Sequence, residues 1–102
     1  MDLIGKSVVM VIAPENFRDE EFLFTKEVLE NHDVDVTVAS KGVSKAKGSL
    51  GATVDIDKEI TDIKIDDYDA LVFVGGSGTN VYFNDETALG IARDFYESGK
   101  IT

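Results

Sequence analysis

The sequence of 102 residues contains no cysteine, and this absence removes several kinds of site. Without thiols, its own residues provide no disulfide framework, no thiolate metal site and no cysteine nucleophile. The chain also has a single proline, Pro14, and a single histidine, His32. At this length it supports one domain at most, because roughly two thirds of the surface of the unfolded chain can be buried in one modest core.

Basic residues are half as numerous as acidic ones, 10 against 20, which gives a formal charge of −10. A chain of this charge repels phosphate backbones and anionic headgroups, so we predict neither a nucleic-acid nor a membrane partner. Long apolar runs are absent too: the run at residues 8–13 is too short to span a bilayer, and residues 1–6 lack the regions of a signal peptide. The simplest compartment is the cytoplasm.

Residues 70–78 (ALVFVGGSG) form an uninterrupted apolar run that ends in glycines. Such a run is typical of a fully buried parallel strand that delivers a loop to a site. Ligands of open α/β sheets lie beyond the carboxyl ends of the strands, and a glycine pair there lets backbone N–H groups approach them closely. Gly75 and Gly76 are therefore the first candidates for a functional site.

Two further segments predict parallel strands. Residues 6–13 are a β-branched run closed by Pro14, and residues 34–39 alternate in polarity. Between them, residues 19–32 have a near-helical apolar pattern, and Asp19 is placed to cap the helix. The apolar residues of this helix are Phe22, Leu23, Phe24, Val28 and Leu29. Together these segments form one right-handed βαβ unit.

The remaining segments complete an α/β pattern. We expect a surface loop at residues 41–51, a minor hairpin or edge strand at 52–57 and a short helical turn within 58–69. A second helix opens at residues 84–87, ends at Ser98 and Gly99, and is followed by the start of a strand at 100–102. The apolar residues of the second helix are Leu89, Ile91, Ala92, Phe95 and Tyr96. The predicted fold is a flavodoxin-like, doubly wound, mostly parallel sheet with helices on both faces.

Three segments in this order resemble the DJ-1/PfpI superfamily, which has the class I glutamine amidotransferase-like fold. The first is the acidic strand-to-helix turn at residues 13–22, and the second is the aspartate, apolar strand and glycine pair at 67–76. The third is the helix at residues 92–100, which is similar to the helix that precedes the family's nucleophile strand. The resemblance covers nearly the whole chain and implies that residues 1–102 are the amino-terminal portion of one domain, incomplete at its carboxyl-terminal side.

The resemblance also implies roles for three residues. Glu21 matches the catalytic acid whose carboxyl group contacts the family's cysteine and tunes its reactivity, so it should point into the pocket beside Gly75 while Glu20 faces solvent. Gly75 and Gly76 match a glycine pair whose N–H groups help to form an oxyanion hole. Each of these residues also has a purely structural interpretation. Glu21 would be an acid in the first turn of the helix, where a negative charge interacts favourably with the macrodipole. The glycines would belong to a turn that requires positive φ.

The sequence departs from the family at several points. The nucleophilic cysteine would lie a few residues beyond Thr102, and the histidine that follows it in many members is also absent. Val74 stands where a proline usually precedes the glycines. Thr79 and Asn80 occupy the region in which peptidase-like members carry an assisting acid. This chain alone should therefore lack thiol-dependent activity.

Three classes of function remain open at this stage. The first is the amino-terminal part of a thiol-dependent, peptidase-like hydrolase or glyoxalase/deglycase-like enzyme, acting on a small carbonyl or peptide substrate without a cofactor. Its partners would be a carboxyl-terminal complement from the same precursor and further copies in a homo-oligomer. The second is a non-catalytic stress-response or chaperone-like member of the same fold. The third is a flavodoxin-like or response-regulator-like binding module, although the acidic pair of receivers and the Ser/Thr-rich loop of flavodoxins are missing.

Other titratable residues have plainer interpretations. His32 is expected to bind carbonyl groups at the end of the first helix. Asp19 and Glu20 are expected to be structural. Six aspartates within residues 55–69 cluster without EF-hand spacing, so we predict a solvated acidic face and no metal site; they are Asp55, Asp57, Asp62, Asp66, Asp67 and Asp69.

Overall fold

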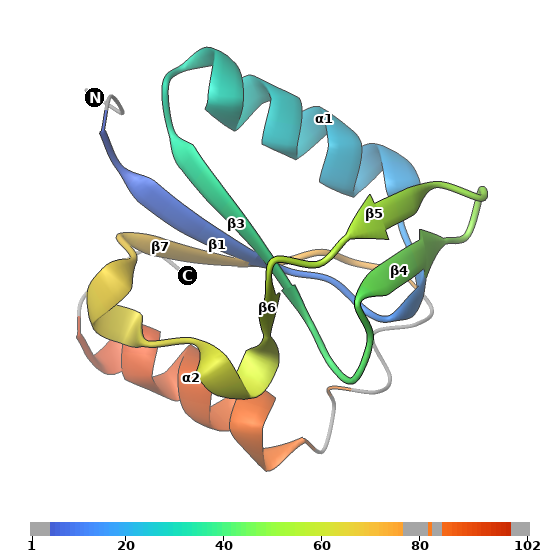
Figure 1. Ribbon diagram of the computed structural model, residues 1–102. Coiled ribbons are helices and arrows are strands. Elements are labelled where there is room, and N and C mark those ends of the chain that lie inside the picture. The colour runs from blue at the N-terminus through green and yellow to red at the C-terminus, as the bar shows by residue number, and fades with distance from the viewer. Residues whose placement is uncertain (1–4, 77–81, 83–84, 99–102) are drawn as a thin grey trace.

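A parallel sheet of four strands forms the centre of the computed structural model, which describes residues 5–76, 82 and 85–98 (Figure 1). Its strands are β1 (Ser7–Val11), β3 (Asp35–Ser40), β6 (Lys58–Glu59) and β7 (Ala70–Phe73), in the order β6-β3-β1-β7. All three pairings are parallel. The predicted arrangement, with the first strand between the second strand and residues 70–74, is confirmed.

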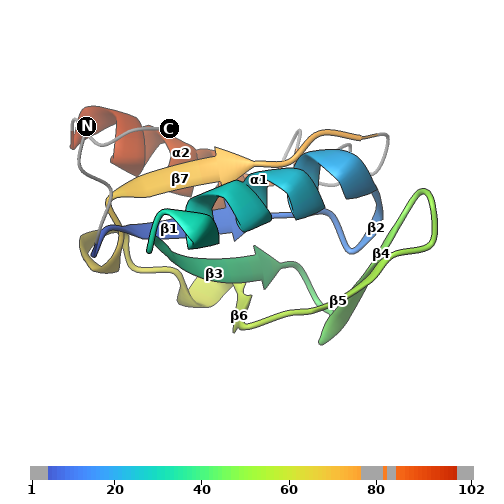
Figure 2. The same cartoon turned by 90° about the horizontal axis from the view of Figure 1, so that it is seen from above.

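Strand β1 lies at the middle of the core because its side chains are apolar on both faces. Residues 8–11 are all buried, and Val9, Met10 and Val11 are fully inaccessible. One helix covers each face of the sheet: α1 (Asp19–Asn31) lies on one side and α2 (Glu86–Glu97) on the other (Figures 1 and 2). The doubly wound architecture with helices on both faces is therefore confirmed.

The apolar pattern located both helices but identified their buried faces only in part. Phe22 of α1 and Phe95 of α2 are buried, and each contributes about 2–3 kcal/mol of hydrophobic stabilisation. Leu23 and Phe24 of α1 are instead exposed. Successive residues on a helix are separated by about 100°, so one apolar stripe can face the sheet while its neighbours face outward. Leu89 and Tyr96 of α2 are exposed in the same way.

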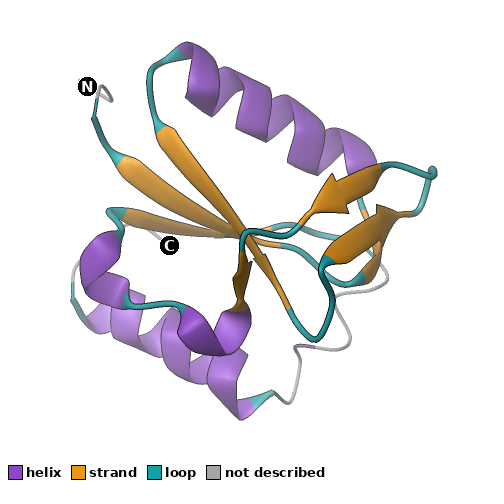
Figure 3. Cartoon of the chain, in the orientation of Figure 1, coloured by secondary structure: helices purple, strands orange, loops and turns teal. Residues whose placement is uncertain are grey.

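A second, three-stranded sheet corrects the prediction of a surface loop at residues 41–51. It consists of β2 (Glu15–Phe17), β4 (Lys45–Gly48) and β5 (Thr53–Asp55), in the order β2-β4-β5 (Figure 3). In β4, buried Ala46 and Gly48 alternate with exposed lysines, as the two-residue period of a strand requires. Lysine and glycine are weak strand formers, so the sequence did not indicate a strand here. Strand β5 pairs antiparallel with β4 and lies at one edge of this sheet within the described residues, which confirms the edge strand, rather than a separate hairpin, at residues 52–57.

Residues 58–69 contain the predicted helical turn against the sheet, together with a short strand that the sequence did not indicate. The turn is two 3-10 helices, η1 (Ile60–Asp62) and η2 (Ile65–Asp67), and Ile60 is buried. Strand β6 is only two residues long, below the length at which a period of two can be recognised.

Strand β7 forms one edge of the main sheet within the described part of the chain, where it pairs only with β1. The predicted glycine stop at Gly99 and the predicted strand at residues 100–102 lie outside the described residues.

Candidate functional site

The turn that follows β1 and the loop that follows β7 lie against each other at the carboxyl end of the sheet. Val74 continues the β7 pairing, because its N–H donates a 3.0 Å hydrogen bond to the carbonyl of Val11. One residue later, the Arg18 N–H donates a 2.8 Å hydrogen bond to the carbonyl of Gly75. Two segments more than fifty residues apart in sequence are thus fixed together by backbone contacts.

Gly76 has a backbone conformation and surroundings that only glycine fits. Its φ is +128°, and a Cβ at this position would lie 2.6 Å from the Asn16 carbonyl oxygen and 2.8 Å from the Arg18 nitrogen. Both neighbours are backbone atoms, which cannot rotate away as a side chain can. Packing alone therefore accounts for a glycine at position 76, and an oxyanion role for its N–H remains a prediction.

Glu21 lies beside the glycine pair, as the sequence interpretation expected. A Cβ on Gly75 would be 3.1 Å from Oε2 of Glu21, so the absence of a side chain at Gly75 makes room for this carboxyl group. The same oxygen lies 3.2 Å from the Arg18 Nε in an ion pair, and the Glu21 side chain is 49% exposed. The structure thus brings Glu21 and Gly75 together, while their chemical roles stay predictions.

Glu20, in the same helical turn, has a side chain that is 55% exposed, close to the value for Glu21. Its carboxylate accepts two hydrogen bonds from Arg18, from Nε at 3.3 Å and from Nη2 at 3.0 Å. Its own backbone N–H, and next Arg18, lower the pKa of Glu20 below the ordinary value of 4.5. Arg18 therefore bridges Glu20 and Glu21 through a single guanidinium group.

Asp19 does not cap α1, which corrects the predicted cap. The cap position belongs to Arg18, and its side chain makes no capping hydrogen bond. The buried Asp19 carboxylate instead accepts 2.9 Å hydrogen bonds from the N–H groups of Leu50 and Ala52. The bond from Leu50 is the main reason that the pKa of Asp19 is below its ordinary value of 3.8. A Cβ on Gly48 would lie 2.3 Å from Oδ2 of Asp19, so this glycine lets the β4–β5 turn close over the carboxylate.

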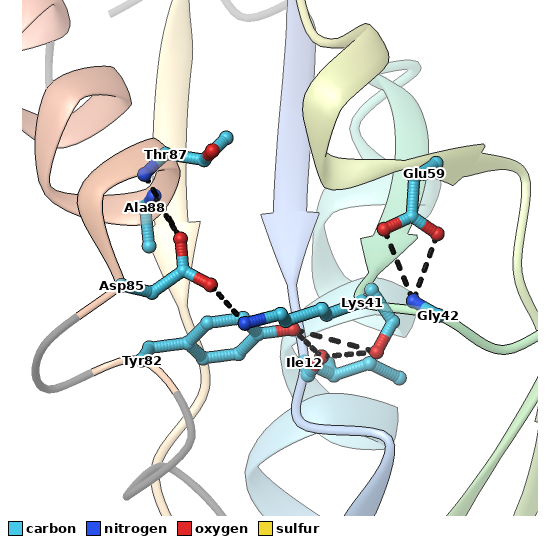
Figure 4. Close-up of polar contacts among 9 residues, drawn as sticks. Ile12, Lys41, Gly42, Glu59, Tyr82, Asp85, Thr87 and Ala88 are labelled. Carbon is cyan, nitrogen blue, oxygen red and sulfur yellow. Dashed lines mark hydrogen bonds and ion pairs between the residues drawn. The ribbon is translucent and has the colours of Figure 1, made fainter.

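Ser40 and Tyr82 form a buried polar contact that the sequence analysis missed. The Ser40 hydroxyl donates a 2.7 Å hydrogen bond to the Ile12 carbonyl, and the Tyr82 hydroxyl donates a 2.8 Å bond to the same oxygen (Figure 4). Burial raises the pKa of the Tyr82 hydroxyl above its ordinary value of 10.0. One feature of the sequence could have indicated this contact: a serine stands at the end of an apolar strand. A serine hydroxyl that becomes buried there needs a hydrogen-bond partner.

Asp85 caps the start of α2, within the segment 84–87 where the sequence predicted this helix to begin. Its side chain also links the helix to the residue that follows β3. One carboxylate oxygen accepts hydrogen bonds from the N–H groups of Thr87 at 2.9 Å and Ala88 at 3.1 Å. The other oxygen forms an ion pair with Lys41 (Figure 4). The hydrogen bond from Lys41 is the largest cause of the lowered pKa of Asp85.

A second carboxylate supports the segment that follows β3. Both oxygens of Glu59 accept from the Gly42 N–H, at 3.0 and 2.8 Å (Figure 4). The positive φ of Gly42, +74°, allows the chain to turn at this point.

Three other titratable residues have structural partners. The Nδ1 of His32 lies 2.8 Å from the Val28 carbonyl oxygen, which confirms the interpretation of His32 as a helix-end residue. Asp57 accepts a 2.9 Å hydrogen bond from the Val38 N–H, and Asp69 accepts one of 2.9 Å from the Ser7 N–H. Asp57 therefore binds the middle of β3 and Asp69 the start of β1, which is more than the solvated face predicted for them.

The described part of the chain contains no cluster of three or more His, Asp or Glu side chains that could hold a metal ion. Within the same residues, no helix combines the length and apolar character needed to cross a membrane. The predicted departure at Thr79 and Asn80 lies outside the described residues.

Comparison with known proteins gives a consistent result over almost the whole chain. The model of the DJ-1/PfpI family matches residues 6–102. An uncharacterized protein of Methanocaldococcus jannaschii is 38% identical over 95 residues, which cover 92% of this chain and 46% of that protein. Protein/nucleic acid deglycase 2 of Escherichia coli is 31% identical over 100 residues, covering 95% of this chain and 57% of the deglycase.

A solved structure agrees with this sequence similarity. The crystal structure of a ThiJ/PfpI domain protein from Brachyspira murdochii has a TM-score of 0.89 and 30% identity, covering 93% of this chain and 56% of that one. The chain spans about half the length of the curated relatives that it matches.

Proposed function

Because this chain belongs to the DJ-1/PfpI family, we propose that it is the amino-terminal part of a thiol-dependent enzyme that acts on carbonyl compounds. Relatives named deglycases favour a deglycase or glyoxalase-like reaction over a peptidase-like one. The observation that carries the proposal is the position of the Glu21 carboxyl group against Gly75, at the carboxyl end of β7. An acid and a backbone loop at this end of a parallel sheet lie where α/β enzymes bind their ligands.

In the proposed reaction, a thiolate from a cysteine outside this chain attacks the carbonyl carbon of the substrate. A carbon–sulfur bond forms, and the π electron pair moves onto the oxygen. The N–H groups of Gly75 and Gly76 would then donate to this oxyanion. Among the described residues, none accepts a hydrogen bond from the Gly75 N–H, so this donor suits the role.

Glu21 would tune the thiol through a contact between its carboxyl group and the sulfur. Its contact with Arg18 uses one oxygen, Oε2. No described residue forms a hydrogen bond with the other oxygen, Oε1, which leaves that atom for the sulfur.

The cysteine would come from a carboxyl-terminal complement of the same precursor, and the described edge of the sheet suits such a partner. Glu21, Phe24 and Val28 follow the spacing i, i+3, i+7, so they share one face of α1. The Glu21 end of this face lies at Gly75, while Phe24 is 70% exposed and Val28 is 39% exposed. A strand that pairs in parallel with β7, followed by a helix packed on Phe24 and Val28, would cover both the edge and the apolar face.

The proposal is tested with the chain bound to its complement, by measuring the pH dependence of thiol alkylation. Glu21→Gln should shift the titration of the thiol, because a neutral amide replaces the ionisable carboxyl group next to the sulfur. Glu27→Gln, an exposed acid of the same helix outside the Arg18 contacts, is the control and should leave it unchanged. Identical titrations for the Glu21 variant and the wild type would remove Glu21 from the site. The purified chain alone should have no activity that a thiol reagent abolishes.

A further inference from the structure

A basic hollow lies outside the proposed catalytic contacts, beside the exposed face of β4. Its volume is about 440 Å³, and its polar lining includes Lys41, Lys45, Lys47, Glu15 and Asn16. It thus gathers three of the 10 basic residues of the chain but only one of its 20 acidic residues. In a protein with a formal charge of −10, this local excess of positive charge stands out against the rest of the sequence.

The fold itself creates this cluster of lysines. Lys45 and Lys47 flank the buried Ala46 on β4, so their side chains leave the strand on the same face. Lys41 directly follows β3 and reaches the hollow from the main sheet. Strand β2, which pairs with β4, supplies Glu15 and Asn16. The site therefore requires both sheets to be in place.

Existing ion pairs leave part of the positive charge uncompensated. Lys41 is paired with Asp85, and Lys45 lies 3.8 Å from Asp55 in a loose, exposed pair. Lys47 makes no ion pair with any residue in the described ranges, although Glu15 is its register partner on β2. Surface pairs such as Lys45 with Asp55 are weak and exchange readily with a competing anion.

We propose that this hollow binds the phosphate or carboxylate group of a small anionic molecule, with Lys47 as its principal contact and Lys45 as the second. Lysine ammonium groups bind such anions as compact point charges with several donors. The hollow adjoins the glycine loop through Asn16, whose carbonyl oxygen lies against Gly76. Anion binding here is independent of the proposed thiol chemistry, because no cysteine takes part in it.

The test is an NMR titration of the full chain as purified, with any copurifying partner retained. Inorganic phosphate is added in one arm and succinate in the other, against sodium chloride at equal ionic strength. We expect saturable amide shifts confined to residues 15–16 and 41–47. Lys47→Gln should weaken binding about tenfold, as is reasonable for the loss of one charge-assisted contact. Lys64→Gln, which removes an exposed lysine remote from the hollow, should leave the affinity unchanged.

Saturation by phosphate alone would assign the hollow to phosphorylated molecules, and saturation by succinate would assign it to carboxylates. Lys45→Gln provides a second variant and should also weaken binding. The proposal is overturned by shifts that do not saturate, by equal shifts with sodium chloride, or by equal losses in the Lys47 and Lys64 variants.

Discussion

The backbone N–H of Arg18 donates a 2.8 Å hydrogen bond to the carbonyl oxygen of Gly75. Arg18 immediately precedes α1, so this bond fixes the first turn of the helix against the loop that follows β7. Glu21 lies one turn further along and consequently reaches Gly75 with its carboxyl group. The position of the candidate acid is thus set by a backbone contact rather than by its own ion pair, which is half-exposed and weak.

Replacing Gly76 with alanine should destabilise the protein more than a positive φ alone explains. The strain of the positive φ costs roughly 1–3 kcal/mol, and the new Cβ would also meet the Asn16 oxygen at 2.6 Å. Gly51→Ala is the control, because Gly51 has a φ of +99° but no atom within 4 Å of its Cβ position. Urea unfolding of both variants measures the difference. Equal losses would show that the contact with the turn at residues 16–18 is unimportant.

Asp19→Asn should reduce the pH dependence of stability in acid. The pKa of Asp19 is lower in the folded state than its ordinary value of 3.8, so its contribution is fully present above about pH 4. The contribution is lost as the pH falls through the folded-state pKa, because protonation weakens the bonds from Leu50 and Ala52. Thermal unfolding at several pH values measures the slope. Asp62→Asn, which removes an exposed acid, should keep the wild-type slope; the hypothesis fails if the Asp19 variant keeps it too.

Ser40→Ala and Tyr82→Phe should have a combined cost greater than the sum of the single costs. Each variant alone leaves the buried Ile12 carbonyl with one of these two donors, so each should lose about 1 kcal/mol of unfolding free energy. The double variant removes both donors and leaves the buried oxygen without either, which adds a desolvation penalty. A double-mutant cycle from denaturant unfolding gives the coupling. Strict additivity would mean that the carbonyl finds another donor.

Phe24→Ser should weaken binding of the carboxyl-terminal complement without destabilising the chain itself. Phe24 is 70% exposed, so the chain loses little contact, whereas a bound helix would lose an aromatic anchor and about tenfold or more in affinity. The control is Leu50→Ser in the β4–β5 turn, where the leucine is 81% exposed. Titration calorimetry with the complement compares the two. If the two variants bind alike, the Phe24 face of α1 is not the docking surface.

The sequence by itself determined the order and type of the main elements. The β-branched run at residues 6–13 and the apolar run at 70–74 predicted strands of the main sheet. Full burial was wrong for the second run, because Phe73 is 37% exposed on β7, an edge strand within the described residues. The spacing of Phe22 and Leu29, and of Ile91 and Phe95, required helices that cover such a sheet. These patterns are local, so they can be recognised without knowledge of the partner segments.

The tertiary structure alone decided which side chains meet. The sequence assigned Asp19 to its own helix, but the carboxylate binds Leu50 and Ala52 across a turn that is thirty residues away. It gave no sign that Ser40 and Tyr82 share the Ile12 carbonyl, or that Lys45 and Lys47 lie on a strand paired with β2 in a small second sheet. Such contacts depend on how distant segments pack. The residues that flank either partner in the sequence do not indicate which buried hydrogen bond will form. Glu21 and Gly75 were paired correctly only through the family resemblance, since no local pattern connects residues 54 positions apart.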